Sequence, residues 1–198
     1  MAEIPRQLWL LRHGATEWAR NGRHTGSTDL PLLEEGEEEA KALAPILSCQ
    51  NFSAVFSSPL QRARRTCELA GLGEQMQICD DILEWDYGDY EGITTRQIRE
   101  TIPNWTVWTH ACPHGETAAL VEARCRAAIK KALSSRGEGD VALFAHGHIL
   151  RALAGTWLGL GAAGGALLKL NTASISILGW ERDQQVISRW NAPTQGLF

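Results

Sequence analysis

The sequence lacks any apolar run near the roughly 18 residues that a membrane helix requires, so we expect no spanning segment. Its first residues, MAEIPRQ, also lack the apolar stretch of a secretory signal peptide. The five cysteines are odd in number, widely spaced and without a CxxC pair, which argues against a disulfide framework and a zinc knuckle. These absences together favour a cytoplasmic protein and no membrane partner.

The chain also lacks an excess of positive charge, with 19 lysines and arginines against 23 acidic residues. The formal net charge is −4, which gives no reason to expect a nucleic-acid partner. An anionic ligand would therefore be bound by a local group of arginines. The 198 residues contain no repeat, low-complexity tract or linker, and we expect one domain over residues 1–198 with a sizeable core.

Strands and helices are expected to alternate along the chain. Short apolar runs predict strands at 8–11, 54–56, 75–79 and 141–145, and a terminal hairpin from 174–180 and 185–190. Helices are expected at 34–47, 59–70, 94–103, 117–134 and from the HGH sequence to about residue 157. This order predicts an α/β domain with a mostly parallel central sheet covered on both faces.

Local signals mark some helix starts and the connecting loops. Ser57-Ser58-Pro59 reads as a serine cap followed by proline at the first helical position. Thr94 and Gln97 have the spacing of a capping box, and Pro103 is expected to end that helix. The turn-rich segment 81–93 is expected to be an ordered loop.

Two of the predicted strands end in similar groups. The strand LWLL is followed by Arg12-His13-Gly14, and VALFA is followed by His146-Gly147-His148. In parallel sheets, ligands bind beyond the carboxyl ends of the strands. If these two strands are neighbours, His13 and His146 meet at one site.

The residue types at these strand ends suit phosphate chemistry. The Arg12 guanidinium matches phosphate geometry and the His13 imidazole is a nucleophile. Arg62, one turn into a helix, adds a second arginine, while Arg64 and Arg65 are expected to face solvent or acidic residues. An alkoxide leaving group needs an acid. Glu84 is the candidate, with its pKa raised by phosphate and by burial against a tryptophan; its rivals by spacing are Asp81, Asp86, Asp89 and Glu91.

The set LRHGATEW, SSPLQRARRT, EWDYGDYEG, HGET and FAHGH, in this order, resembles the histidine phosphatase superfamily, which includes the phosphoglycerate mutases. The resemblance implies a three-layer α/β/α sandwich and a two-step mechanism without metal or cofactor. It implies that His13 forms a phosphohistidine and that Glu84 donates the proton. It also implies that Arg12, Arg62 and His146 surround the phosphate. His13 must attack as the neutral tautomer, so its far nitrogen should donate to a backbone carbonyl.

One position departs from the family pattern. Many members carry asparagine where this chain has Ala19, and that asparagine binds phosphate. Alanine has no side-chain donor, so either the site loses some stabilisation of the transition state, or Thr25, the Gly26 backbone or a water molecule replaces the contact.

The finer resemblance is to sugar bisphosphatases, such as sedoheptulose-1,7-bisphosphatase, and it extends to phosphatases of carboxyarabinitol 1-phosphate and xylulose 1,5-bisphosphate. It implies that Tyr87 and Arg151 contact substrate. A second phosphate needs a further cation, for which Arg151, one turn into the helix after HGH, is the candidate; the alternative is a salt bridge from Arg151 between helix and loop. We add Gly147, His148 and Arg96 as further candidates. Two locations are equally expected for Trp85, Trp105 and Trp108: the wall of the pocket and the hydrophobic core. The expected partner is a small phosphorylated sugar.

Three alternatives remain. The first is a phosphoglycerate mutase, which the short segment between Glu84 and Gly115 disfavours because mutases typically carry a longer insertion there. The second is a non-catalytic phospholigand-binding protein, suggested by Ala19. The third is a metal hydrolase that uses His146 and His148 with His110 and His114, for which no carboxylate partner is evident.

Overall fold

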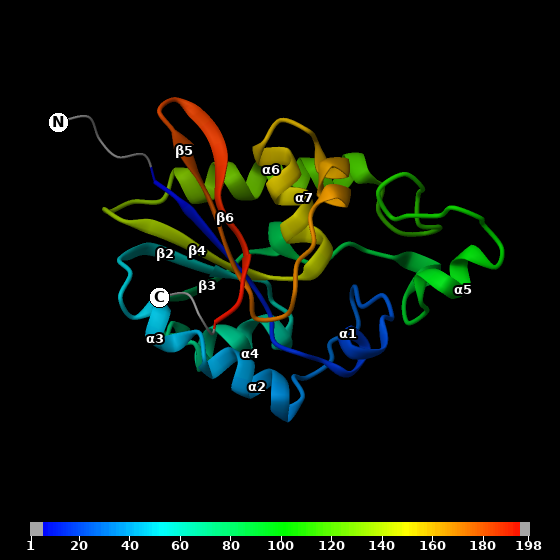
Figure 1. Cartoon of the computed structure of the whole chain (residues 1–198), viewed down its shortest axis with the longest axis horizontal. Coiled ribbons are helices and arrows are strands. Elements are labelled where there is room, and N and C mark those ends of the chain that lie inside the picture. Colours follow the sequence, from blue (N-terminus) through cyan, green and yellow to red (C-terminus); the bar gives the residue numbers. More distant parts are fainter. Residues whose placement is uncertain (1–5, 195–198) are drawn as a thin grey trace.

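The computed structural model describes residues 6–194 and arranges them in three layers (Figure 1). The ends of the expected domain, residues 1–5 and 195–198, lie outside this range. The central sheet has the order β3-β2-β4-β1-β5-β6. Its strands are β1 (Leu8–Arg12), β2 (Phe52–Ser57), β3 (Met76–Ile78), β4 (Asp140–Ala145), β5 (Ile175–Glu181) and β6 (Gln184–Ala192). Strands β1 to β4 are mutually parallel, and β5 and β6 form an antiparallel hairpin at one edge.

Helices cover both faces of this sheet. They are α1 (Glu17–Asn21), α2 (Glu34–Lys41), α3 (Ala44–Leu47), α4 (Gln61–Leu69), α5 (Thr95–Arg99), α6 (Ala118–Leu133) and α7 (Gly147–Trp157). Figure 1 shows α6 and α7 above the sheet and α2, α3 and α4 below it. The predicted α/β fold with a mostly parallel sheet is confirmed.

The two faces of the sheet bury alternate residues of the same strands. In β1, Leu8 and Leu10 pack into the core beneath α6 and α7, while Trp9 and Leu11 pack into the core against α3 and α4. The central strands β1 and β4 are apolar except at one terminal residue each, Arg12 and Asp140, as expected for a sheet that is covered on both sides. The carboxyl ends of β1 and β4 are thereby held side by side.

The acidic run was predicted to start a helix, and α2 does begin at Glu34, but one helix does not continue to residue 47. The helix breaks after Lys41 and resumes as α3. Pro45 explains the break because it has no N–H to donate to the carbonyl of Lys41, four residues earlier. The short helix α1 was not predicted at all.

The start of α4 also differs from its prediction. The helix begins at Gln61, not at Pro59, and its N-cap residue, Leu60, has no side-chain acceptor. The Ser58 hydroxyl accepts from the Leu60 amide (3.4 Å) ahead of the helix and also lies 2.8 Å from Nε2 of His146. By contrast, the capping box of Thr94 and Gln97 is confirmed at α5, although that helix ends at Arg99, before Pro103.

Within residues 6–194, no helix is both long and apolar enough to cross a bilayer. All five cysteines are free thiols. Cys49 is exposed and the other four are buried. Burial raises the pKa of Cys67, Cys112 and Cys125 to about 12, so these thiols are uncharged at neutral pH.

Candidate active site

The end of β1 fixes both the position and the tautomer of His13. The backbone N–H of His13 donates to Ala145 on the neighbouring β4 (3.0 Å). Its ring Nδ1 lies 2.7 Å from the carbonyl oxygen of Gly14, which only accepts, so Nδ1 carries the proton and Nε2 is the free nitrogen. Burial, then the positive charges of Arg62 and Arg12, lower the pKa of His13 well below its usual value. His13 is therefore a neutral imidazole with Nε2 free, the state that the predicted nucleophile requires.

His146 meets His13 as expected, with ring centroids 5.2 Å apart. Its Nδ1 accepts from Nε of Arg62 (3.0 Å), and its Nε2 lies 2.8 Å from the hydroxyl of Ser58. Since arginine only donates, the proton of His146 must be on Nε2. Burial and the charge of Arg62 lower the pKa of His146, so this ring is a neutral donor.

Arg62 is fully buried and is held mainly by the loop that follows α1. Besides His146, its guanidinium donates to the carbonyl oxygens of Thr25 (3.0 Å), Gly26 (3.0 Å) and Thr28 (2.8 Å). These bonds shape the loop that closes one side of the site. Arg12, His13, Arg62 and His146 are called the basic cluster below.

Arg12 is the member of the basic cluster with free donors. One terminal nitrogen donates to the carbonyl of Leu170 (2.6 Å), and the buried Nε has no partner among residues 6–194. An unpaired buried donor is costly unless a ligand satisfies it. Arg12 lines the cavity described below, so its guanidinium is available to an anion there.

Glu84 reaches the same cavity from the predicted loop and is bound by backbone amides. Its Oε1 accepts from Trp85 (2.9 Å) and Ile149 (2.8 Å), and its Oε2 accepts from His148 (3.0 Å). The last two amides belong to the first turn of α7, which has no cap of its own, so Glu84 serves as that cap. Because Oε2 accepts only one amide, it keeps a lone pair for a proton.

The rival carboxylates lie elsewhere. Glu91 accepts from the amides of Gly26 and Thr28, and Asp86 accepts from Gly88. Asp89 lies 3.1 Å from the exposed His114. Among the acids weighed from the sequence, Glu84 alone lines the cavity.

A second set of side chains, called the aromatic wall below, consists of His24, Tyr87 and His148. The Tyr87 hydroxyl lies 2.6 Å from Nδ1 of His148, and the rings of His24 and Tyr87 are 4.6 Å apart. Burial lowers the pKa of His148 well below its usual value, and burial raises that of Tyr87. Next to the wall, the Arg151 guanidinium lies 4.7 Å from the Trp108 ring centroid and donates to Gly165 (3.1 Å).

These groups enclose a cavity of about 210 Å³. Most residues predicted from the sequence line it: Arg12, His13, Thr25, Glu84, Tyr87, Gly147, His148 and Arg151. Arg62, His146 and Gly26 do not; the first two lie beneath it. Arg96 lies outside, in an adjoining open hollow that shares Arg23 and Thr95 with the cavity.

Several lining residues were not predicted: Thr16, Trp18, Gly22, Arg23, His24, Thr95 and Leu170. They come from α1 and its N-cap, the loop that follows α1, the start of α5 and the segment before β5. Thr16 and Trp18 belong to the LRHGATEW motif but were not predicted as site residues. Ala19 also lines the cavity, next to Thr16, whose hydroxyl accepts from the Ala19 amide (3.2 Å). Trp85 and Trp105 pack in the core, so Trp18 is the tryptophan of the cavity.

The histidines weighed as metal ligands have other partners. His146 is bonded to Arg62 and Ser58, and His148 to Tyr87. His110 lies by Thr109 (2.9 Å), on the surface. Among residues 6–194, no three His, Cys, Asp or Glu side chains are grouped as a metal site. The cavity instead presents a nucleophile, a carboxyl group and a guanidinium.

Comparison with known proteins agrees with this chemistry. Residues 8–193 match the model of the histidine phosphatase superfamily (branch 1). An acid phosphatase of Mycobacterium tuberculosis is 42% identical over 88% of this chain and 87% of its own length. Sedoheptulose 1,7-bisphosphatase of Saccharomyces cerevisiae is 36% identical over 81% of this chain and 70% of its own. The solved structure of an M. tuberculosis open reading frame product, 39% identical, superposes with a TM-score of 0.90 over 96% of this chain and 98% of that one.

Proposed function

Since this chain belongs to the histidine phosphatase superfamily, we propose that it hydrolyses a sugar phosphate or bisphosphate through a phosphohistidine at His13, without a metal ion. The observation that carries the proposal is the 2.7 Å bond from Nδ1 of His13 to the Gly14 carbonyl, which leaves Nε2 free as the nucleophile. The acid phosphatase and bisphosphatase relatives support a phosphoric monoester hydrolase.

In the first step, Nε2 of His13 attacks phosphorus and the bond to the sugar oxygen breaks. Protonated Glu84 gives its proton to that oxygen, so a neutral hydroxyl leaves. The guanidinium of Arg12, with its unpaired Nε, stabilises the charge that develops on the transferring oxygens. The Nε2–H of His146 turns from Ser58 to the phosphoryl group as a further donor.

In the second step, a water molecule attacks the phosphohistidine. Glu84, now a carboxylate, takes the proton of that water, and inorganic phosphate leaves. His13 returns to the neutral state that its lowered pKa favours. The same carboxyl group thus serves both steps and ends protonated, ready for the next substrate.

The aromatic wall supports a polyhydroxylated substrate. The Tyr87 hydroxyl and the neutral rings of His24 and His148 offer donors and acceptors to sugar hydroxyls. Arg151 offers a guanidinium in the same cavity for a second phosphate. Xylulose 1,5-, sedoheptulose 1,7- and fructose 1,6-bisphosphate and carboxyarabinitol 1-phosphate are the candidate substrates.

The proposal is tested by phosphate release in excess chelator. The panel holds the three bisphosphates, carboxyarabinitol 1-phosphate, 3-phosphoglycerate and p-nitrophenyl phosphate, with His13→Ala as the control. We expect one sugar phosphate to be preferred and the control to be inactive. Activity that vanishes with chelator would contradict the metal-free mechanism.

Two other results would redirect the assignment. Interconversion of phosphoglycerates without phosphate release would indicate a mutase. Binding of inorganic phosphate with no turnover on any compound would indicate a phospholigand-binding protein, in which Ala19 lacks the donor that catalysis needs.

A further inference from the structure

An ion pair outside the cavity holds the backbone that carries Glu84. Arg124, on α6, donates from Nε and from one terminal nitrogen to the two carboxylate oxygens of Glu116, each at 2.7 Å. The two side chains are only 22% and 18% exposed. Burial lowers the pKa of Arg124, but the hydrogen bonds and charge of Glu116 outweigh it, so this pKa lies above its usual value.

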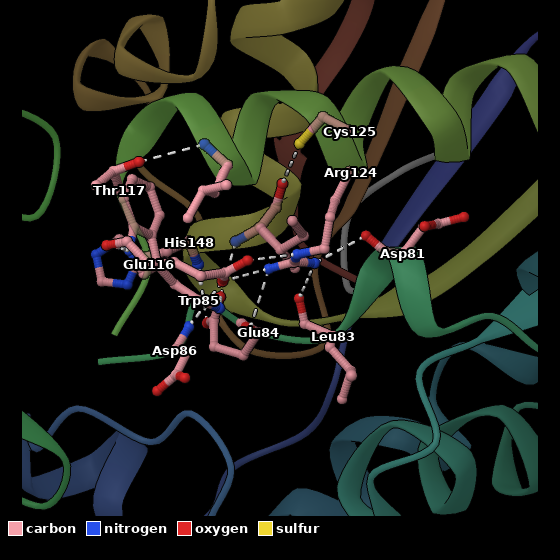
Figure 2. A network of polar contacts seen from close by, with 12 residues as sticks. Asp81, Leu83, Glu84, Trp85, Asp86, Glu116, Thr117, Arg124, Cys125 and His148 are labelled. Atoms are coloured by element: carbon pink, nitrogen blue, oxygen red, sulfur yellow. Dashed lines mark hydrogen bonds and ion pairs between the residues drawn. The ribbon is translucent and has the colours of Figure 1, made fainter. Parts of the chain in front are cut away.

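The remaining donors of Arg124 bind the chain leading to Glu84. One terminal nitrogen donates to the carbonyl oxygens of Asp81 (2.9 Å) and Leu83 (3.0 Å), and the other reaches that of Glu84 (3.4 Å). Figure 2 shows the guanidinium between the carboxylate of Glu116 and this segment. All five N–H groups are therefore used, in a planar fork that lysine cannot reproduce.

Glu116 binds the segment beyond Glu84. Its Oε2 accepts from the amide of Asp86 (3.0 Å), and its own amide donates to the carbonyl of Asp86 (2.8 Å). Its carbonyl accepts from the indole of Trp85 (3.1 Å). The ion pair thus binds residues 81–86 on both sides of Glu84, while the carboxyl group of Glu84 itself is held by α7.

We propose that Arg124 and Glu116 are positioning residues for the proton transfer by Glu84. Neither side chain lines the cavity, so they act on Glu84 through the backbone of residues 81–86 and through the charge of Arg124, which Arg124→Lys keeps. A small displacement of an acid relative to the leaving oxygen is sufficient to slow catalysis by about 10²-fold. This inference rests on the proposed function, in which Glu84 is the general acid.

The test compares substrates that do and do not need an acid. Arg124→Lys keeps the charge and loses the fork. For this variant, kcat/KM is measured on p-nitrophenyl phosphate, whose leaving group is a weak base, and on an alkyl phosphate, whose leaving group requires a proton. We expect the ratio of kcat/KM between the alkyl and aryl substrates to fall by about tenfold or more. A ratio is independent of the fraction of folded enzyme, so instability of the variant does not affect it.

The matched control is Arg126→Lys. Arg126 lies on the same helix and pairs with Glu122 (2.6 Å), but Arg126 is exposed and its hydrogen bonds go to Glu122, not to residues 81–86. We expect its ratio to equal that of the wild type. Glu116→Gln, which keeps the volume and removes the charge, should shift the ratio in the same direction as Arg124→Lys.

A double variant separates the inference from the proposed function. If Arg124 acts through Glu84, Arg124→Lys should leave the ratio of Glu84→Gln unchanged. An equal loss on both substrates in Arg124→Lys, or an additive loss in the double variant, would overturn the positioning role. A Glu84→Gln variant with the wild-type ratio would instead overturn Glu84 as the acid, and with it the proposed function.

Discussion

The basic cluster and the aromatic wall border one cavity but are built differently. The basic cluster lies at the adjacent ends of β1 and β4, with Arg62 from the helix that follows β2, and backbone carbonyls bind several of its donors. The aromatic wall comes from the loop after α1, the loop before α5 and the start of α7. Its members contact one another through rings and a single hydroxyl.

The difference separates two tasks. A phosphoryl group is common to every candidate substrate, and a rigid sheet edge holds the groups that would meet it. The rest of the substrate varies, and the groups that would meet it come from two loops and the first turns of α7, outside the sheet. We therefore expect substitutions in the basic cluster to affect all substrates and those near the wall to affect some.

The largest effect is expected at Arg12, the member of the basic cluster with unpaired donors. Arg12→Lys keeps the charge but loses Nε and the fork, so kcat/KM should fall by about 10²–10³-fold on every substrate of the panel. Arg64→Lys, an exposed arginine on α4, is the control. A loss confined to bisphosphates would indicate that Arg12 binds the variable part of the substrate, like the aromatic wall, and not the transferring phosphoryl group.

The second largest effect, on stability, is expected at Gly14, in the backbone of the basic cluster. A Cβ on Gly14 would lie 2.1 Å from the carbonyl oxygen of Gly36, whereas one on Gly147 would meet only the Arg12 side chain, at 3.4 Å. Gly14→Ala should therefore lower the free energy of unfolding by about 3 kcal/mol, measured in urea, and Gly147→Ala by much less. Equal losses would show that the close approach of α2 does not support the cluster.

The wall should make stability depend on pH. Burial lowers the pKa of His24 from 6.5 to about 4, against the opposing charge of Glu91. Between these values the unfolded chain binds a proton that the folded chain does not, so stability falls as the pH falls. His24→Asn should remove about 2 kcal/mol of the loss in unfolding free energy between pH 7 and pH 5. The exposed His110→Asn is the control, and an identical pH dependence in both variants would contradict this account.

The smallest effect is expected at Arg151, beside the wall. Arg151→Ala should reduce kcat/KM about tenfold more for a bisphosphate than for its monophosphate, because one charged hydrogen bond is lost. The exposed Arg126→Ala should reduce both equally. Equal losses in Arg151→Ala would assign it to the support of the loop at Gly165, to which it donates.

The sequence predicted the basic cluster better than the wall for a physical reason. Arg12-His13-Gly14 and His146-Gly147-His148 each follow an apolar run directly, and the geometry of parallel sheets brings such ends together. Of the aromatic wall, His148 shares this signal and Tyr87 lies in a family motif, whereas His24 has no local signal. His24 and Thr95 are 71 positions apart in the chain and meet at 3.3 Å only through the folded loops.

The start of α4 was mispredicted for the same physical reason: contacts between residues far apart in the chain. Ser58 has the residue type of an N-cap and accepts from the Leu60 amide at 3.4 Å, but its hydroxyl makes a shorter contact, 2.8 Å, to the distant His146, and the helix begins only at Gln61. Glu84 shows the converse, because a side chain 65 residues away caps α7 by accepting from Ile149. Local sequence patterns describe the competition for hydrogen bonds between neighbouring residues. Ser58 and Glu84 also bond to residues far away in the chain, which such patterns do not show.

The most direct measurement of the central claim is to trap the phosphoenzyme. The enzyme is mixed with its best substrate, quenched in base, where phosphohistidine survives, and mapped by mass spectrometry. The account predicts one phosphoryl group on His13, absent from His13→Ala and lost in acid. Turnover in the wild type with no phosphorylated His13, or with the group on another residue, would contradict it.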